Sequence, residues 1–136
     1  MQPIPSPSGY MAQESRPTKG STDRARAREF SIETARLLSG SHCENILILG
    51  VHGLSDITDF IVVASGTSDR QIKAVAEDVE QLAKSWNLTR FGREQDVSTT
   101  WLVIDFVEVI VHLFEPAMRE HYDLEMLWGD AVTVDW

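Results

Sequence analysis

Cysteine, long apolar runs and, over most of the chain, basic residues are scarce in this sequence of 136 residues. The single Cys43 excludes an internal disulfide and a metal site built from several cysteines, and it is predicted to be a small buried apolar residue. No apolar run approaches the roughly 20 residues that a transmembrane helix needs. The N-terminus also lacks the hydrophobic centre of a secretory signal. A cytoplasmic location is therefore expected, with an Arg-rich organelle transit peptide as the alternative.

Charge is divided unevenly along the chain. Residues 1–28 carry 5 basic and 2 acidic side chains, a net charge of +3, and the remaining 108 residues carry 7 basic and 19 acidic ones, a net charge of −12. Because phosphate contacts need clustered Lys and Arg, the acidic body argues against direct binding of nucleic acid. An acidic surface suits a basic protein partner, or it serves solubility alone.

Composition divides the chain into three parts. Residues 1–22 are rich in Pro, Gly and Ser and poor in apolar side chains, so they are predicted to be a disordered tail. Residues 23–131 are predicted to form one α/β domain, since the chain is long enough for one core but not two. Residues 132–136 are assigned to a C-terminal extension.

The stretch 101–114 predicts two consecutive strands. Both of its apolar runs are rich in β-branched and aromatic residues and contain no Gly or Pro. If the chain reverses about Val107 and Glu108, the predicted partners are Trp101 and Phe114, Val103 and His112, and Asp105 and Ile110. A two-residue turn favours Asn, Asp or Gly, so Val107 and Glu108 suit it poorly. A four-residue loop with the same pairing is the alternative.

Alternation along these strands assigns every side chain to one face of the sheet. The first face is wholly apolar and is predicted to be core: Leu102, Ile104, Phe106, Val109, Val111 and Leu113. The second face mixes apolar and polar groups: Trp101, Val103, Asp105, Ile110, His112 and Phe114. Such a face is either covered by helices of the same protein or offered to a partner, and both interpretations stay open.

Periodicity and end signals predict the remaining elements. These are a helix over 23–38, strands over 46–49 and 60–64, a helix from Ser68 to Trp86, a short strand over 88–91, a polar loop over 92–100, a helix over 116–123 and an apolar turn over 124–128. Ser68 with Gln71 three residues on makes a capping box. A strand–helix–strand unit followed by an antiparallel strand pair predicts a mixed sheet.

Three groups of residues are candidate sites for chemistry. Residues 66–70 lie at a helix N-terminus and suit an anion, although Asp69 opposes it and Ser68 serves equally as a cap. Asp56 and Asp59 suit a metal or acid–base role, but two carboxylates in a turn are also commonplace. Asp105 and His112 share a face and resemble a base with its orienting carboxylate, without a Ser or Cys nucleophile nearby. The other three histidines, His42, His52 and His121, form no metal-spaced cluster.

Three stretches together resemble the ribosomal silencing factor family, also called the Iojap or YbeB family. They are residues 56–76 (DITDFIVVASGTSDRQIKAVA), residues 101–114 (WLVIDFVEVIVHLF) and residues 119–131 (REHYDLEMLWGDA). The three motifs fall in family order, are together highly specific, and the likeness spans roughly residues 30–131.

The resemblance implies a single α/β/α domain with a mixed sheet of about five strands, a nucleotidyltransferase-like topology without the catalytic residues, and a homodimer. It also implies a function: binding the large ribosomal subunit through a basic ribosomal protein, number fourteen of that subunit, at the intersubunit face, and thereby blocking subunit joining when nutrients are short. Such a protein acts by steric occlusion, is not an enzyme and needs no cofactor or metal.

Carried over to this sequence, the predicted contacts with that ribosomal protein are Trp101, Val103, Asp105, Glu108, Ile110, His112, Tyr122 and Trp128. Tyr122 and Trp128 are alternatively core anchors of the C-terminal helix. The chain departs from the family pattern at residues 107–108, where Gly-Asp is usual, at Gly50, where Asp is common, and in its extra N-terminal tail. Two other functions remain as alternatives: a nucleotidyltransferase-like enzyme using residues 66–68 and Asp56 or Asp59, and a homodimeric adaptor.

Overall fold

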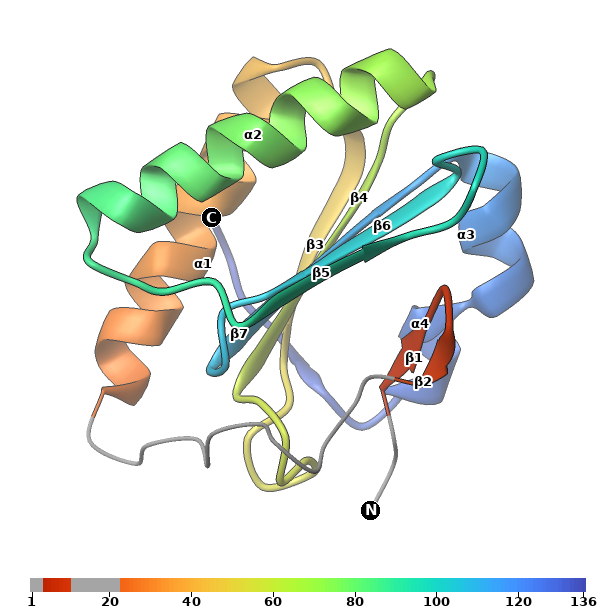
Figure 1. Cartoon of the computed structure of the whole chain (residues 1–136). Helices are drawn as coiled ribbons and strands as arrows, with labels where there is room; N and C mark the ends of the chain where they lie inside the picture. The colour runs from red at the N-terminus through yellow and green to blue at the C-terminus, as the bar shows by residue number, and fades with distance from the viewer. Residues whose placement is uncertain (1–3, 11–22) are drawn as a thin grey trace.

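The computed structural model describes residues 4–10 and 23–136 of the chain (Figure 1). In chain order the elements are β1 (Pro5–Ser6), β2 (Gly9–Tyr10), α1 (Arg24–Gly40), β3 (Glu44–Gly50), β4 (Phe60–Ser65), α2 (Asp69–Ser85), β5 (Gly92–Gln95), β6 (Trp101–Asp105), β7 (Val109–Phe114), α3 (Pro116–Tyr122), α4 (Leu124–Leu127) and β8 (Val132–Thr133).

Six strands form one mixed sheet in the order β5-β6-β7-β4-β3-β8. β4 and β7 are parallel, and the other neighbouring pairs are antiparallel. The parallel pair arises because the chain leaves β4 through α2 and returns to the sheet before β7, as a crossover connection requires. The predicted α/β fold with a mixed sheet is confirmed.

The predicted pairing of β6 with β7 is confirmed residue by residue, including Trp101 with Phe114. A two-residue turn closes it, since the Phe106 N–H donates to the Val109 carbonyl at 2.9 Å. Val107 adopts a φ of 73° there, a conformation that β-branched residues rarely take. The Val107 N–H donates to Asp105 Oδ1 at 2.8 Å, so the carboxylate supports the turn that the residue types disfavour.

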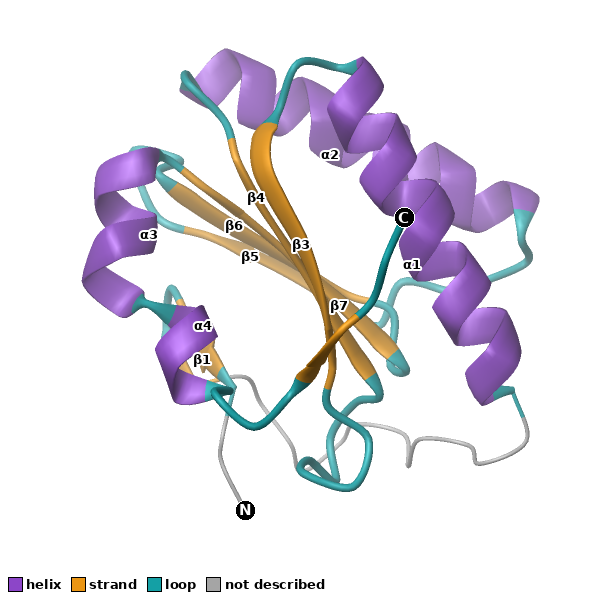
Figure 2. Ribbon diagram, turned by 180° about the vertical axis from the view of Figure 1, so that it is seen from behind, coloured by secondary structure: helices purple, strands orange, loops and turns teal. Residues whose placement is uncertain are grey.

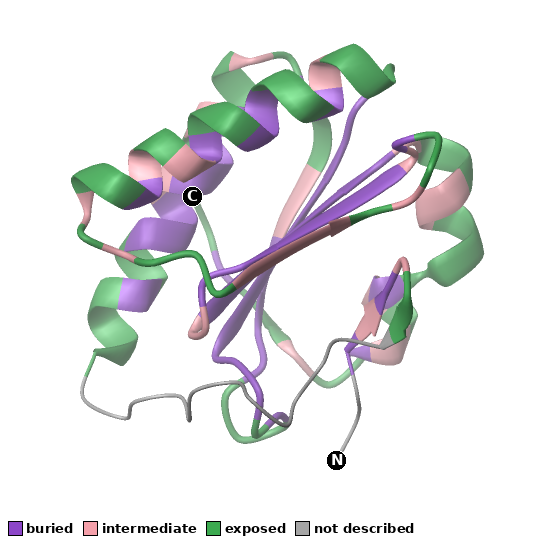
Figure 3. Ribbon diagram, in the orientation of Figure 1, coloured by how far each residue is buried: buried purple, intermediate pink, exposed green. Residues whose placement is uncertain are grey.

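Each face of the sheet is covered by a separate layer (Figure 2). α1 and α2 pack on the first face, where the six predicted core residues of β6, β7 and their turn are all buried. On the second face, α3, α4 and Ile4 join the core cluster that contains Trp101 and Ile110. Figure 3 shows the resulting buried strands between two sets of elements whose outer surfaces are exposed. The second face is therefore covered, which was one of its two interpretations.

Of the two helices on the first face, α2 begins where its sequence predicts. Ser68 is the N-cap of α2, and its side chain accepts a hydrogen bond from the Gln71 N–H at 3.1 Å. The Gln71 side chain reaches back one residue further than a capping box requires, because it accepts from the Thr67 N–H at 2.7 Å. Cys43 is buried with a free thiol, as predicted.

Three segments differ from the prediction. The strand expected over 88–91 lies instead at Gly92–Gln95, where backbone pairing with β6 decides the conformation of residues with low strand propensity. Residues 132–136 contribute β8, so they extend the sheet instead of leaving it. Residues 4–10, assigned to a disordered tail, form a hairpin of β1 and β2. The rest of that predicted tail, residues 1–3 and 11–22, lies outside the described residues.

Candidate functional site

An aromatic cluster lies on the second face of the sheet, formed by Trp101, His112, Phe114 and Tyr122. The Trp101 and Phe114 rings are 5.0 Å apart at 22°, and the Tyr122 ring of α3 lies 4.3 Å from Trp101. Trp101 and Phe114 meet because they are direct partners in the register, and His112 is the diagonal neighbour of Trp101. The cluster therefore joins two strands to the helix that follows them.

His112 is held as a neutral imidazole inside this cluster. The Trp101 Nε1–H donates to His112 Nδ1 at 3.1 Å, so the neutral ring carries its proton on Nε2. Burial lowers the pKa of His112 from 6.5 to about 3. Within the described part of the chain, neither His112 Nε2 nor Trp128 Nε1 has a hydrogen-bond partner. Two N–H donors thus remain unused in the core behind the second face.

The structure buries most of the predicted contact residues. Six of the eight are buried: Trp101, Val103, Asp105, Ile110, His112 and Trp128. Glu108 is partly exposed in the turn before β7, and Tyr122 is 41% exposed although its ring packs on Trp101. Tyr122 therefore anchors α3 and also reaches the surface. Trp101, Val103, Ile110 and Trp128 share one apolar cluster, whereas Glu108 lines a hollow with Ala27 of α1 and Phe106.

Exposed apolar side chains lie on α3, on α4 and in the loop before β4, and of these the predicted contact set names only Tyr122. We define the α3–α4 patch as Tyr122, Met126 and Leu54; Met126 is 79% exposed. Leu54 and Met126 line a hollow of about 420 Å³ together with Leu127 and Gly129. Residues 124–128 were predicted as an apolar turn, and a helix of four residues is too short for periodicity to show which side chain points outward.

Acidic side chains are frequent in the segment that carries the patch: Asp130 lines the same hollow as Met126, and Glu120 and Asp123 line another hollow with Arg119. Residues 115–130 contain 5 acidic side chains and 1 basic one, Arg119. The Arg119 guanidinium is occupied by its own chain, because it donates to Glu125 Oε1 at 2.6 Å and to Ser65 Oγ at 3.0 Å. Arg119 also donates to the Asn45 carbonyl. It thereby fixes α3 to the ends of β3 and β4 and leaves Glu120, Asp123 and Asp130 exposed.

The candidate anion site at residues 66–70 is built as a helix start. The Gly66 N–H donates to the Phe114 carbonyl at 2.8 Å, and the Thr67 N–H donates to Gln71. A Cβ on Gly66 would lie 2.7 Å from Ile72, so close packing against α2 accounts for this glycine. These contacts use groups of the loop that a phosphate would need.

The candidate metal residues are not assembled into a site. Asp56 is exposed, whereas Asp59 is buried and lies 4.0 Å from Arg24. Over residues 4–10 and 23–136, no three His, Cys, Asp or Glu side chains gather as metal ligands. In the same residues no helix is long and apolar enough to cross a membrane.

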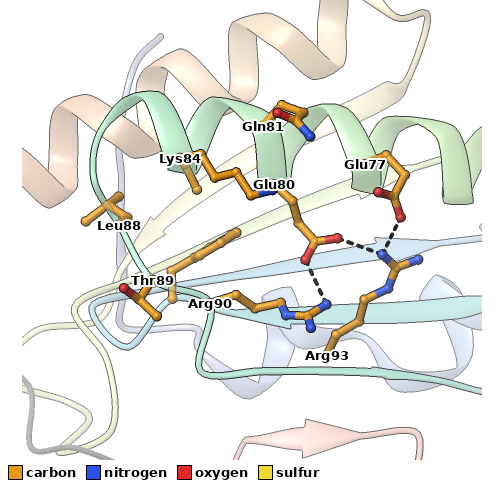
Figure 4. A pocket seen from close by; sticks show the side chains of 10 residues that line it. Glu77, Glu80, Gln81, Lys84, Leu88, Thr89, Arg90 and Arg93 are labelled. Atoms are coloured by element: carbon orange, nitrogen blue, oxygen red, sulfur yellow. Dashed lines mark hydrogen bonds and ion pairs between the residues drawn. The ribbon is translucent and has the colours of Figure 1, made fainter.

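A separate hollow of about 490 Å³ lies between α2 and the stretch that leads into β5 (Figure 4). Its two arginines and two glutamates are paired with one another. Arg93 contacts Glu77 at 2.8 Å and Glu80 at 2.7 Å, and Arg90 contacts Glu80 at 2.8 Å. This network ties the edge strand to α2, and it shares no residue with the predicted contact set.

Comparison with known proteins gives four findings. A family model described as "Ribosomal silencing factor during starvation" matches residues 24–136. The chain is 37% identical over 101 residues to the ribosomal silencing factor of Haemophilus influenzae, covering 74% of this chain and 96% of that one. It is 35% identical over 92 residues to the silencing factor of Halalkalibacterium halodurans, covering 68% and 79%. A solved structure of a Chromobacterium violaceum protein superposes with a TM-score of 0.69 at 31% identity, covering 77% of this chain and 85% of that chain.

Proposed function

Because the chain belongs to the ribosomal silencing factor family, we propose that it binds the large ribosomal subunit through a basic ribosomal protein, number fourteen of that subunit. Bound at the intersubunit face, it occludes the surface that the small subunit needs and so represses translation. This mechanism requires shape and charge but no catalytic group. The proposed contact surface is the α3–α4 patch, and the sheet face with Trp101, Asp105 and His112, which the structure buries, joins it only once that face is uncovered.

The observation that carries this proposal is the composition of the α3–α4 patch. It combines apolar side chains, Met126 above all, with the exposed carboxylates of Glu120, Asp123 and Asp130. An apolar centre with a charged rim is the usual anatomy of a protein–protein interface. The acidic rim favours a basic partner, both by attraction in the complex and by steering the encounter.

Co-sedimentation with purified large ribosomal subunits tests the proposal. The variant Met126→Lys places a cation at the centre of the patch, and because Met126 is 79% exposed the fold should tolerate it. Ala74→Lys is the matched control, since Ala74 is exposed on α2, on the other side of the sheet. We expect Met126→Lys to weaken binding about tenfold or more and Ala74→Lys to bind like the wild type. Equal binding by all three proteins would exclude the patch, and no binding by any would exclude the function.

The other implications of the resemblance are proposals too. The protein is expected to act in the cytoplasm. It is also expected to be a homodimer, and sedimentation equilibrium of the free chain measures this oligomeric state directly. The enzymatic alternative predicts nucleotide and magnesium binding at residues 66–68 with Asp56 or Asp59. Calorimetric titration with nucleotide and magnesium separates the two functions, because a steric factor binds neither.

A further inference from the structure

The N-terminal hairpin, residues 4–10, packs on the second face of the sheet. Ile4 is wholly buried in the same apolar cluster as Trp101, Val103 and Ile110, and Ser6 is buried as well. Figures 1 and 2 show the hairpin beside α4, in front of it in one view and behind it in the other. It precedes the segment that the family model matches, which begins at residue 24. A segment outside the family domain therefore covers part of the proposed contact surface.

The hairpin depends on this packing against the sheet for its stability. Its strands are two residues each, and Gly9 after the turn has a φ of +117°, which L side chains rarely adopt. A two-stranded hairpin is at best marginally stable in water, so burial of Ile4 has to supply much of its stability. Burial of Ile4 thus anchors the hairpin to the apolar cluster of the second face.

The covered face also carries unused hydrogen-bonding groups. His112 Nε2 and Trp128 Nε1 are buried donors, and among the described residues neither has an acceptor. A buried donor without an acceptor is unfavourable. A partner that offers a carbonyl or carboxylate oxygen at this face would satisfy a group that the free protein leaves unpaired.

We propose that the N-terminal hairpin is an intramolecular competitor of the basic ribosomal partner, and that it leaves the face with Trp101 and His112 when this partner binds there. The inference rests on the proposed function, because it concerns regulation of that same surface. While the hairpin is seated, the apparent affinity falls in proportion to the fraction of molecules whose face is open. The hairpin thereby raises the concentration of large subunit that is needed for half-maximal binding.

Full-length variants of the hairpin test this competition. Ile4→Asp puts a charge at the buried position, and Ser8→Asp puts the same charge at an exposed position of the same hairpin. We expect Ile4→Asp to bind large ribosomal subunits about tenfold more tightly than the wild type, the factor that burial of one isoleucine supports, and Ser8→Asp to bind unchanged. Gly9→Val is a second route, because it strains the hairpin without placing a charge near the core. It should also tighten binding.

The indole N–H resonances of Trp101 and Trp128 report the seat independently of the ribosome. In Ile4→Asp they should shift and exchange faster with water, while Ser8→Asp should match the wild type. If these resonances change but subunit affinity does not, the hairpin is seated without competing, and the inference is overturned. If neither changes, the hairpin does not cover the face, which also overturns it. Failure of the wild type and all three variants to bind subunits would instead overturn the proposed function, and the inference with it.

Discussion

Replacing His112 with asparagine should flatten the dependence of stability on pH. The side chain is wholly buried, and burial lowers its pKa from 6.5 to about 3. Asparagine still offers an oxygen to the Trp101 indole N–H, which His112 Nδ1 accepts at 3.1 Å, but it does not titrate. The comparison therefore isolates protonation from the loss of the hydrogen bond.

The sign and size follow from proton linkage. Because the pKa is lowered in the folded state, the unfolded chain binds a proton at this histidine below pH 6.5 while the folded protein does not. Stability is intact above pH 6.5 and is lost as pH falls from 6.5 toward 3, where the folded state also takes up the proton. Between pH 7 and pH 5 the loss due to His112 is about 2 kcal/mol.

Urea unfolding at several pH values, followed by tryptophan fluorescence, measures this difference. The wild type should lose about 2 kcal/mol more than His112→Asn between pH 7 and pH 5. His121→Asn is the control, because His121 is exposed on α3, and it should follow the wild type. Parallel curves for the wild type and His112→Asn would refute the reasoning, since they would mean that the imidazole is not held neutral by burial.

Three further changes test separate parts of the account. Ser68→Ala removes the N-cap of α2 and should lower the free energy of unfolding by about 1 kcal/mol in urea titration, whereas an unchanged midpoint would mean that the cap is redundant. Val107→Gly relieves a φ of 73° and should raise the free energy of unfolding by about 1 kcal/mol, so a lower free energy of unfolding would contradict the strain. Arg119→Met should lower the thermal midpoint and make α3 more accessible to hydrogen exchange, because it breaks the contacts with Glu125 and Ser65, and unchanged exchange would exclude Arg119 as the anchor of α3.

The strand pair was predictable because its signals are local. Alternation with a period of two assigned the side chains of residues 101–114 to two faces, and the partner of Trp101 followed from the position of the reversal. The residue types at the turn argued for a longer loop, yet pairing along both strands and the Asp105 carboxylate hold Val107 in an unfavourable conformation. Tertiary pairing overrode local propensity there, as it did in β5.

What covers the second face was not predictable from local signals. Ile4 is a lone apolar side chain in a segment rich in proline and serine, and no periodicity links it to Trp101. Composition averages over such a segment and so predicts disorder. The same reasoning failed at Met126, because a four-residue helix does not define an inner and an outer side. The strand residues among the predicted contacts share one face because of their register, but their burial depends on segments distant in sequence, and their contact with a partner stays a prediction.

The central claim is that this protein keeps ribosomal subunits apart, and a joining assay tests it most directly. Large subunits are incubated with the protein, small subunits are added, and the joined fraction is measured on a sucrose gradient, with Met126→Lys and Ala74→Lys alongside. The account predicts that the joined fraction falls as the wild type or Ala74→Lys is added, and that Met126→Lys needs a higher concentration for the same effect. Wild-type protein that travels with the large subunit while the joined fraction stays constant would contradict the account.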